Sequence, residues 1–498
     1  MKLYNSESKQ KELFQPLNPN EVEIYCCGPT VYDYAHIGNF RSFLMADLLV
    51  RVLKYAGYKT KKVMNITDVG HLTNDDLADA DGDDKIGKKA KSSGKTAWEI
   101  AKFYTEKFIE DEQALRIQPP NHRPKATEFI KEQIKIVKTL QKRGFAYEIN
   151  GSYYFRVGKF SDYGRLSGNK LEDLELGKRV EVLNEKESPL DFALWKTGDE
   201  KHLMQWDFTT GEKINASNLH LSPDNPTWGF PGWHVECSAM SRAYLGDCFD
   251  IHTGGEDNLF PHHECEIAQN ECSCQMQNQG KKSVNYWLHA KHLLVDGQKM
   301  SKSKGNFYTI RDLFAQGWLE QEIRYLLLSA HYRTALNFSM KGLEQARKNI
   351  ERLTEAKNIF AKYLQKKKET LEYKNIQTFV SRYKEALTDD LNVSESLAVV
   401  FELIKYGLKL RENKELSIEI ATEIHHFLTN DFDDIFDIFP EEKVISDELK
   451  AKVEDLIAQR TEARTNKDWD KSDQIRDELS AMGIKIKDGA NGTEWEIS

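Results

Sequence analysis

Residues 26–39 read CCGPTVYDYAHIGN, and this stretch decides the fold. The run Val22–Tyr25 before it predicts a strand that ends at Cys26 and Cys27. The H-I-G-N residues His36–Asn39 open a long amphipathic helix. A strand, a Gly-containing turn and a helix N-terminus place free N–H groups and the positive end of the helix dipole toward a docked anion. A soft metal ligand beside such a pocket suggests a small thiol or carboxylate substrate that a nucleotide activates.

The residues that follow extend this unit into a parallel sheet. Apolar side chains recur every three or four positions over 38–57, which predicts a helix, and Gly57 fits the position just after its end. Residues 62–69 (KVMNITDV) predict a second strand. Strand, helix and strand form one βαβ unit, so we expect an α/β fold with a Rossmann-type parallel sheet.

Composition limits the class of protein. The chain has 498 residues and a net charge of −9, and its mean hydropathy is −0.63. We therefore expect a soluble, cytoplasmic protein with no membrane association and no signal peptide. Seven scattered cysteines disfavour a disulfide framework and suit a reducing compartment.

An acidic chain can hold nucleic acid only through local basic patches. Three segments qualify: 85–95, with five lysines and no acid; 123–143, with seven basic residues and two glutamates; and 291–311, with five basic residues and one aspartate. The alternative for each segment is a solvated helix face.

Proline and glycine divide the chain into successive parts. Pro119, Pro120 and Pro124 mark a boundary, and frequent Gly, Ser and Asp up to about Pro226 predict an inserted domain with turns. Apolar residues at helical spacing from Leu343, in a segment free of proline, predict a helical bundle. The predicted parts are 1–116 and 226–290 (two halves of a Rossmann domain), 117–225 (inserted domain), 291–342 (a region with a lysine-rich loop), 343–440 (helical bundle) and 441–498 (small C-terminal module).

Two constellations carry the chemistry. His262 and Glu266 are four residues apart on a predicted helix, and with Cys27 and Cys237 they offer a donor set suited to zinc. Spacing alone leaves rival ligands open: Cys26, His263, Cys265, Cys272 and Cys274. Residues 299–303 read KMSKS, and lysines on such a Ser/Gly loop form a mobile cationic clamp for triphosphate charge.

Together these motifs resemble class I aminoacyl-tRNA synthetases, with H-I-G-N at 36–39 and K-M-S-K-S at 299–303. The flanking sequences resemble cysteinyl-tRNA synthetases specifically; they are CGPTVYDYAHIGN, NITDV, PGWHVECSAM, FPHHECEIAQ and LVDGQKMSKSKGN. Near the C-terminus, the segment RTEARTNKDWDKSDQIRDEL is similar to the anticodon-binding module of that family. The resemblance covers nearly the whole chain, in order.

The resemblance implies roles for individual residues. It implies zinc ligation by Cys27, Cys237, His262 and Glu266, contact of His36 and Asn39 with ATP, and stabilisation of the transferring phosphates by Lys302, with Lys299 in the same loop. It further implies a cysteine pocket lined by Trp233 and Thr67, and Asp257 near the adenylate ribose. The implied partners are L-cysteine, ATP with Mg²⁺ and tRNA(Cys), and we expect a monomer.

Two features depart from the family pattern. Asn39 occupies the fourth position of the first motif, where His is usual, so we expect a modest change because Asn still donates a hydrogen bond but cannot be cationic. Residues 71–82 intervene between NITD and DDKI, and we interpret them as a solvated loop.

Two other functions fit parts of the sequence. A ligase that passes activated cysteine to an amino sugar would share the catalytic half, but the module 441–498 disfavours it. A non-catalytic zinc-containing RNA-binding protein would be expected to lack the two ATP motifs, and both are present.

Overall fold

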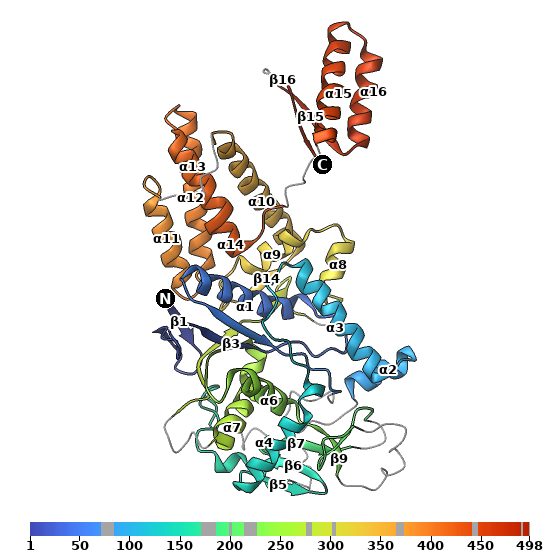
Figure 1. Ribbon diagram of the computed structural model, residues 1–498, viewed down its shortest axis with the longest axis vertical. Coiled ribbons are helices and arrows are strands. Elements are labelled where there is room, and N and C mark those ends of the chain that lie inside the picture. The colour runs from blue at the N-terminus through green and yellow to red at the C-terminus, as the bar shows by residue number, and fades with distance from the viewer. Residues whose placement is uncertain are drawn as a thin grey trace. The chain divides into compact units, whose positions relative to one another are not determined.

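A computed structural model describes residues 1–70, 84–170, 186–198, 202–213, 227–274, 281–300, 305–364, 373–440, 447–489 and 492–497 (Figure 1). The chain separates into two compact units, Met1–Ile438 and Phe439–Ser498. The 71–82 segment and Lys302 lie outside the described residues. None of the described helices combines the length and the apolarity that a membrane crossing requires.

The first unit is built on a four-stranded parallel sheet in the order β11-β10-β3-β4. Its strands are β3 (Val22–Cys26), β4 (Thr60–Met64), β10 (Phe249–Gly255) and β11 (Val284–Ala290). Helix α1 (Ile37–Tyr55) connects β3 to β4, which confirms the predicted βαβ unit and the α/β class. Sequence order reverses between β3 and β10, and ligands of open α/β sheets bind beyond the carboxyl ends of strands at such a switch point.

Strand β4 is shorter than the predicted strand over 62–69 because its last residues pair with a loop. The Gly28 N–H donates to Asn65 Oδ1 at 2.8 Å, and the Thr67 N–H donates to the Pro29 carbonyl at 3.0 Å. This pairing holds residues 65–67 against the turn that follows β3. A Cβ on Gly28 would lie 1.7 Å from the Asn65 carbonyl oxygen, so only glycine allows this approach.

Helix α1 is buried along most of its length, as the apolar spacing predicted. Gly57 follows its end with φ = +95°, a backbone conformation that suits glycine. Inside the unit, Asp47 Oδ2 accepts from Arg51 at 2.8 Å and from Arg324 of α9 (Glu320–Leu328) at 2.7 Å. Burial opposes ionisation of Asp47, but the two guanidinium groups hold its pKa below the usual value. This network fixes α1 to α9.

The inserted segment forms an antiparallel sheet in the order β5-β6-β7-β9-β8. Its strands are β5 (Ala146–Ile149), β6 (Ser152–Phe155), β7 (Phe192–Thr197), β8 (Trp206–Asp207) and β9 (Trp228–Pro231). Strand β6 confirms the strand predicted near Tyr153. Helix α4 (Ile130–Lys142) precedes this sheet and packs against α6 (Trp233–Leu245) and α7 (Glu264–Cys274), the helices before and after β10.

The remaining elements of the first unit surround this core. They are β1 (Lys2–Asn5), β2 (Gln10–Leu13), α2 (Lys85–Ser93), α3 (Ala97–Ala114), β12 (Leu293–Val295), β13 (Gln298–Lys299), α8 (Ile310–Ala315), β14 (Leu336–Phe338), α10 (Met340–Ala361), α11 (Gln377–Thr388), α12 (Val393–Glu412), α13 (Ile418–Phe427) and α14 (Asp433–Phe436). Helices α10–α13 pack against one another, as the helical spacing after Leu343 predicted.

The second unit consists of two helices and a hairpin: α15 (Asp447–Thr465), α16 (Trp469–Ala481), β15 (Ile484–Gly489) and β16 (Gly492–Ile497). Its core includes Val453, Ile475 and Leu479. The charged Arg460 and Arg464 side chains both pair with Asp488, which ties α15 to the hairpin.

Candidate active site and metal centre

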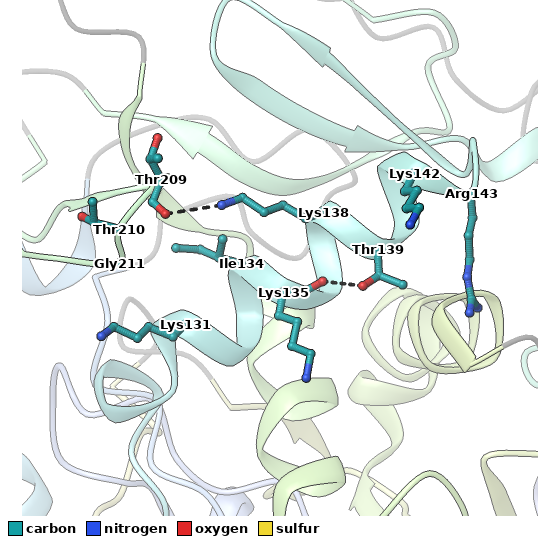
Figure 2. A pocket seen from close by; sticks show the side chains of 10 residues that line it. All are labelled: Lys131, Ile134, Lys135, Lys138, Thr139, Lys142, Arg143, Thr209, Thr210 and Gly211. Atoms are coloured by element: carbon teal, nitrogen blue, oxygen red, sulfur yellow. Dashed lines mark hydrogen bonds between the residues drawn. The ribbon is translucent and has the colours of Figure 1, made fainter.

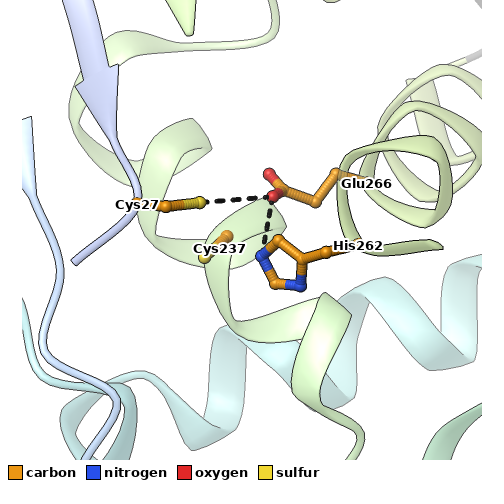
Figure 3. A group of neighbouring side chains, drawn as sticks. All are labelled: Cys27, Cys237, His262 and Glu266. Carbon is orange, nitrogen blue, oxygen red and sulfur yellow. Dashed lines mark hydrogen bonds and ion pairs between the residues drawn. The ribbon is translucent and has the colours of Figure 1, made fainter. Parts of the chain in front are cut away.

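Four side chains from three segments meet at the carboxyl end of β3. Cys27 follows β3, Cys237 lies on α6, His262 lies in a π-helical turn (Leu259–His263), and Glu266 lies on α7. One ligand atom from each lies within 4.8 Å of the other three (Figure 3). Glu266 Oε1 lies 3.0 Å from His262 Nε2 and 3.9 Å from Cys27 Sγ. All four are buried, so this group could hold a metal ion.

The protonation of this group is set by its members. Burial raises the pKa of Cys27 well above its ordinary value, whereas the hydrogen bond from Cys27 lowers the pKa of Cys237 to about 7. Burial opposes the charged form of His262, but Cys237 and Glu266 raise its pKa to about 10. Burial also opposes ionisation of Glu266, but His252 and His262 lower its pKa to about 2. In the metal-free group, an imidazolium therefore balances the acidic ligands.

A second group overlaps the first and could also hold an ion: Cys27, His252, His263 and Glu266. Within it, His263 Nε2 lies 3.3 Å from Cys27 Sγ, and His252 Nε2 lies 3.1 Å from Glu266 Oε2. The two groups share Cys27 and Glu266 but contain different histidines. Both His262 and His263 are therefore placed where they could bind a metal ion.

The cysteines that rivalled these ligands lie in neither group. Cys265 Sγ lies 3.4 Å from the Tyr163 hydroxyl, and the Cys274 thiol donates to Asp247 at 3.1 Å. Cys26 is the last residue of β3, and successive strand residues point to opposite faces. Cys272 is buried on α7.

A layer of histidines surrounds the metal group, and of these the sequence motifs indicated only the rival ligand His263. His234 Nδ1 lies 2.9 Å from His262 Nδ1, and His263 Nδ1 lies 2.8 Å from His289 Nε2. Burial lowers the pKa of His289 to about 3, so this ring is neutral at physiological pH. For the others, the only sequence signal was the number of histidines in segments that form the buried sheet and its helices.

The two predicted pocket residues lie next to the metal group. The Trp233 ring centroid lies 4.3 Å from that of His262. The Thr67 hydroxyl donates to Glu236 Oε2 at 3.1 Å, and Glu236 precedes the ligand Cys237 on α6. Thr67 from the segment after β4 and Trp233 from α6 thus lie beside Glu236 and His262, at the metal group.

The H-I-G-N residues form a reciprocal helix cap at the start of α1. The Asn39 N–H donates to His36 Nδ1, and the His36 N–H donates to Asn39 Oδ1, each at 3.1 Å. This is a capping box made by His and Asn. The cap uses the Asn39 oxygen, and among the described residues no hydrogen bond uses the Asn39 amide nitrogen as a donor.

The flanks of the K-M-S-K-S loop reach this cap. The Ile37 N–H donates to the Tyr308 carbonyl at 3.0 Å, and the His36 ring lies 5.3 Å from that of Phe307. A Cβ on Gly38 would lie 3.4 Å from Met300 Cε. The fold therefore brings the two motifs together, although residues 301–304, including Lys302, lie outside the described part of the chain.

The remaining predicted residues lie on nearby loops. Asp257 is exposed in the single turn Glu256–Asn258 that follows β10. Lys299 is exposed at the end of β13, two residues before the part of the loop that is not described.

Comparison with solved structures identifies the fold. Mycobacterium tuberculosis methionyl-tRNA synthetase in complex with methionyl-adenylate aligns over 84% of this chain and 92% of its own, with a TM-score of 0.57 and 12% identity. An Agrobacterium radiobacter LeuRS–tRNA–LeuAMS complex aligns over 85% of both chains, with the same TM-score and identity. The parallel sheet, with H-I-G-N at its switch point, is the fold of class I aminoacyl-tRNA synthetases.

Sequence comparison narrows the class to one family. Residues 13–348 match the family "tRNA synthetases class I (C) catalytic domain", and residues 446–495 match "Cysteinyl-tRNA ligase anticodon binding domain". The cysteine–tRNA ligase of Brachyspira hyodysenteriae is 41% identical over 99% of this chain and 98% of its own. That of Thermus thermophilus is 40% identical over 99% of both. The chain belongs to the cysteine–tRNA ligase family.

Proposed function

We propose that the chain activates L-cysteine with ATP to give cysteinyl-adenylate and transfers the cysteinyl group to the 3′ end of tRNA(Cys). The proposal rests chiefly on one observation: similarity to cysteine–tRNA ligases extends over the full chain, through both matched domains. A buried Cys/His/Glu group at the end of β3, the strand that leads to the H-I-G-N cap, fits the same reaction.

The metal that suits the first group is zinc, held by Cys27, Cys237, His262 and Glu266. Two sulfurs, one imidazole and one carboxylate are ordinary zinc donors, and the first group contains two thiols whereas the second contains one. When bound, zinc supplies a soft Lewis acid that accepts the sulfur of cysteine in preference to the harder hydroxyl of serine. Cysteine and serine differ by one atom, which a pocket that reads only shape rejects poorly.

Activation requires positioning and charge stabilisation by the two motifs. The cysteine carboxylate attacks the α-phosphate of ATP, and the bond to the β-phosphate breaks to release pyrophosphate. The proposed ATP contacts are His36, Asn39 and Asp257, with Mg²⁺ bound to the phosphates. Lys299 and Lys302 neutralise the charge that moves to the leaving pyrophosphate. The N-terminus of α1 adds backbone N–H groups and a favourable dipole.

Substrate and tRNA use the remaining surfaces. Trp233 and Thr67 line the cysteine pocket, and the Thr67–Glu236 hydrogen bond fixes the threonine side chain. A terminal ribose hydroxyl of the tRNA then attacks the adenylate carbonyl, and AMP leaves. The second unit reads the anticodon through placed polar and aromatic groups, such as the exposed Trp469, since its net charge is not positive. We also propose that the chain is a cytoplasmic monomer. Its domains are those expected from the sequence, with boundaries after residues 116, 225, 290, 342 and 440.

Two assays test the reaction in sequence. Cysteine-dependent exchange of pyrophosphate into ATP is expected without tRNA, and charging of tRNA(Cys) is expected when the tRNA is added. Exchange without charging, together with transfer to an amino sugar, would support the sugar-ligase alternative. A lack of both activities in the zinc-loaded chain would support the non-catalytic alternative.

Zinc binding to the metal-free chain is expected to release about two protons at pH 8, one from the Cys27 thiol and one from the His262 imidazolium. At pH 6 we expect zinc binding to release about one proton more than at pH 8, because Cys237, with a pKa of about 7, is then mostly protonated. Metal affinity accordingly falls as the pH is lowered from 8, and it falls more steeply below pH 7. Calorimetry in buffers of different ionisation enthalpy measures the release. A proton count near zero would contradict this ligand set, and one that is equal at both pH values would contradict the lowered pKa of Cys237.

The Asn39 side chain is expected to have two separable roles. Asn39→Ala removes the cap acceptor and the donor, so we expect a loss of about 1 kcal/mol in unfolding free energy and weaker use of ATP. Asn39→Asp keeps the acceptor but places a carboxylate near phosphate, so stability stays while kcat/KM for ATP falls about tenfold to a hundredfold. Urea unfolding and pyrophosphate exchange measure the two effects.

The control for this position is Asn39→His. The imidazole accepts at one nitrogen and donates at the other, as the Asn amide does, so stability and activity should both stay close to those of the unchanged chain. An Asn39→Asp variant with unchanged exchange kinetics would show that Asn39 serves only the cap.

A further inference from the structure

A basic cavity of about 730 Å³ lies between helix α4 and the turn after β8, remote in sequence from both ATP motifs (Figure 2). Five of its lining side chains are basic and none is acidic. They are Lys131, Lys135, Lys138, Lys142 and Arg143, which we call the α4 basic stripe; the other lining residues are Ile134, Thr139, Thr209, Thr210 and Gly211.

The stripe follows the geometry of the helix. The four lysines occupy positions i, i+4, i+7 and i+11, so they share one face of α4. All four are exposed, whereas Val137 and Leu140 on the opposite side are buried. The stripe coincides with the C-terminal part of the basic segment 123–143, whose role the proposed reaction does not explain.

The charges of the stripe are not neutralised within the described part of the chain. Lys138 Nζ donates to the Thr209 carbonyl at 3.4 Å and lies 5.1 Å from the centroid of the Phe208 ring. Arg143 donates to the Cys272 carbonyl at 2.8 Å. Among the described residues, no carboxylate forms an ion pair with any member of the stripe. Like charges at i, i+4 spacing disfavour a helix, so an anionic partner would stabilise this arrangement.

The shape and lining of the cavity indicate the kind of anion. Lys131 and Lys142 are eleven residues apart, about 16 Å along the helix axis, which suits an extended polyanion. The lining has no aromatic ring on which a base could stack, so it does not resemble a nucleotide pocket. A single apolar lining residue, Ile134, offers too little surface to anchor the patch in a lipid bilayer.

The position of α4 relates the stripe to the active site. Arg143 contacts the last turn of α7 through Cys272, and the first turn of α7 carries Glu266. Helix α7 has eleven residues and is therefore about 16 Å long. A tRNA whose 3′ end enters the active site would thus have part of its backbone within reach of α4. We propose that the α4 basic stripe binds the phosphate backbone of the tRNA, an inference that rests on the proposed function.

The test neutralises the three lysines that have no side-chain hydrogen bond or ion pair among the described residues. The full chain carrying Lys131→Gln, Lys135→Gln and Lys142→Gln is compared with one carrying Lys→Arg at the same positions, which keeps the charge. The probe is a tRNA(Cys) transcript that the unchanged chain aminoacylates. For the Gln variant, Kd is expected to rise about ten- to a hundredfold at 0.1 M salt, and the slope of log K against log salt to fall by about two to three.

The Arg variant is expected to match the unchanged chain in affinity and salt slope. Pyrophosphate exchange, which needs no tRNA, should be equal in all three proteins. An unchanged tRNA affinity and salt slope in the Gln variant would overturn the inference while leaving the proposed function intact. Binding to anionic lipid vesicles that the Gln substitutions abolish, with RNA affinity unchanged, would also overturn it and assign the stripe to a membrane surface. Absence of exchange in the unchanged chain would instead overturn the proposed function.

Discussion

Replacing Cys237 by alanine is expected to abolish stoichiometric zinc binding and cysteine-dependent pyrophosphate exchange. Cys237 supplies one of two sulfurs in the buried group, and its lowered pKa makes it the thiol that ionises more readily. Loss of an outer partner of a metal ligand already costs about 10- to 100-fold in affinity or activity, and loss of a ligand should cost more. Metal content after dialysis, measured together with exchange rates, checks this expectation.

Cys26→Ala is the matched control, because Cys26 is also buried and adjoins the ligand Cys27. It should retain one zinc per chain and most of the activity. Urea unfolding of both variants separates loss of metal from loss of fold. Full zinc retention in the Cys237→Ala variant would move the ion to the overlapping group, which contains His252 and His263 but not Cys237.

Lys302→Ala is expected to lower the rate constant of adenylate formation by about 10²- to 10³-fold with little effect on cysteine binding. One preorganised group that stabilises transition-state charge is worth about this much. Described residues on both sides of Lys302 in the sequence reach the α1 cap, since Met300 approaches Gly38 and the Ile37 N–H donates to the Tyr308 carbonyl. Pre-steady-state quench-flow with saturating ATP measures the rate, and equilibrium binding measures the affinity for cysteine.

Lys302→Arg keeps the charge and should recover part of the lost rate. A Lys302→Ala variant in which adenylation and cysteine affinity decline to the same extent would contradict the clamp role. A decline confined to tRNA charging would place Lys302 in the second step instead.

Much of the fold follows from local patterns in the sequence. The apolar spacing of α1, the glycine at its end and the short strand β3 predicted the βαβ unit, because periodicity reports burial directly. The end of β4 could not be predicted, since Asn65 and Thr67 pair with a loop that is distant in sequence. The strand propensity of a segment does not determine which other segment its backbone will form hydrogen bonds with.

The site was predictable in its parts but not in its surroundings. Cys27, Cys237, His262 and Glu266 were selected with the help of the family resemblance, and the fold places their ligand atoms within 4.8 Å of one another. The second group needs His252 on β10 next to Glu266 on α7, a contact between elements that no spacing encodes. The helix start at H-I-G-N was predicted, but the cap between His36 and Asn39 was not, because histidine is not among the residues usually preferred at an N-cap.

The central claim is that one metal ion, held by Cys27, Cys237, His262 and Glu266, recognises cysteine by its sulfur. The most direct measurement is the absorption spectrum of the Co²⁺-substituted chain titrated with cysteine and, separately, with serine. Cysteine is expected to increase the sulfur-to-cobalt charge-transfer absorption, because a further thiolate joins the ion, while serine leaves the spectrum unchanged. A spectrum that cysteine does not alter, or that serine alters equally, would contradict the account.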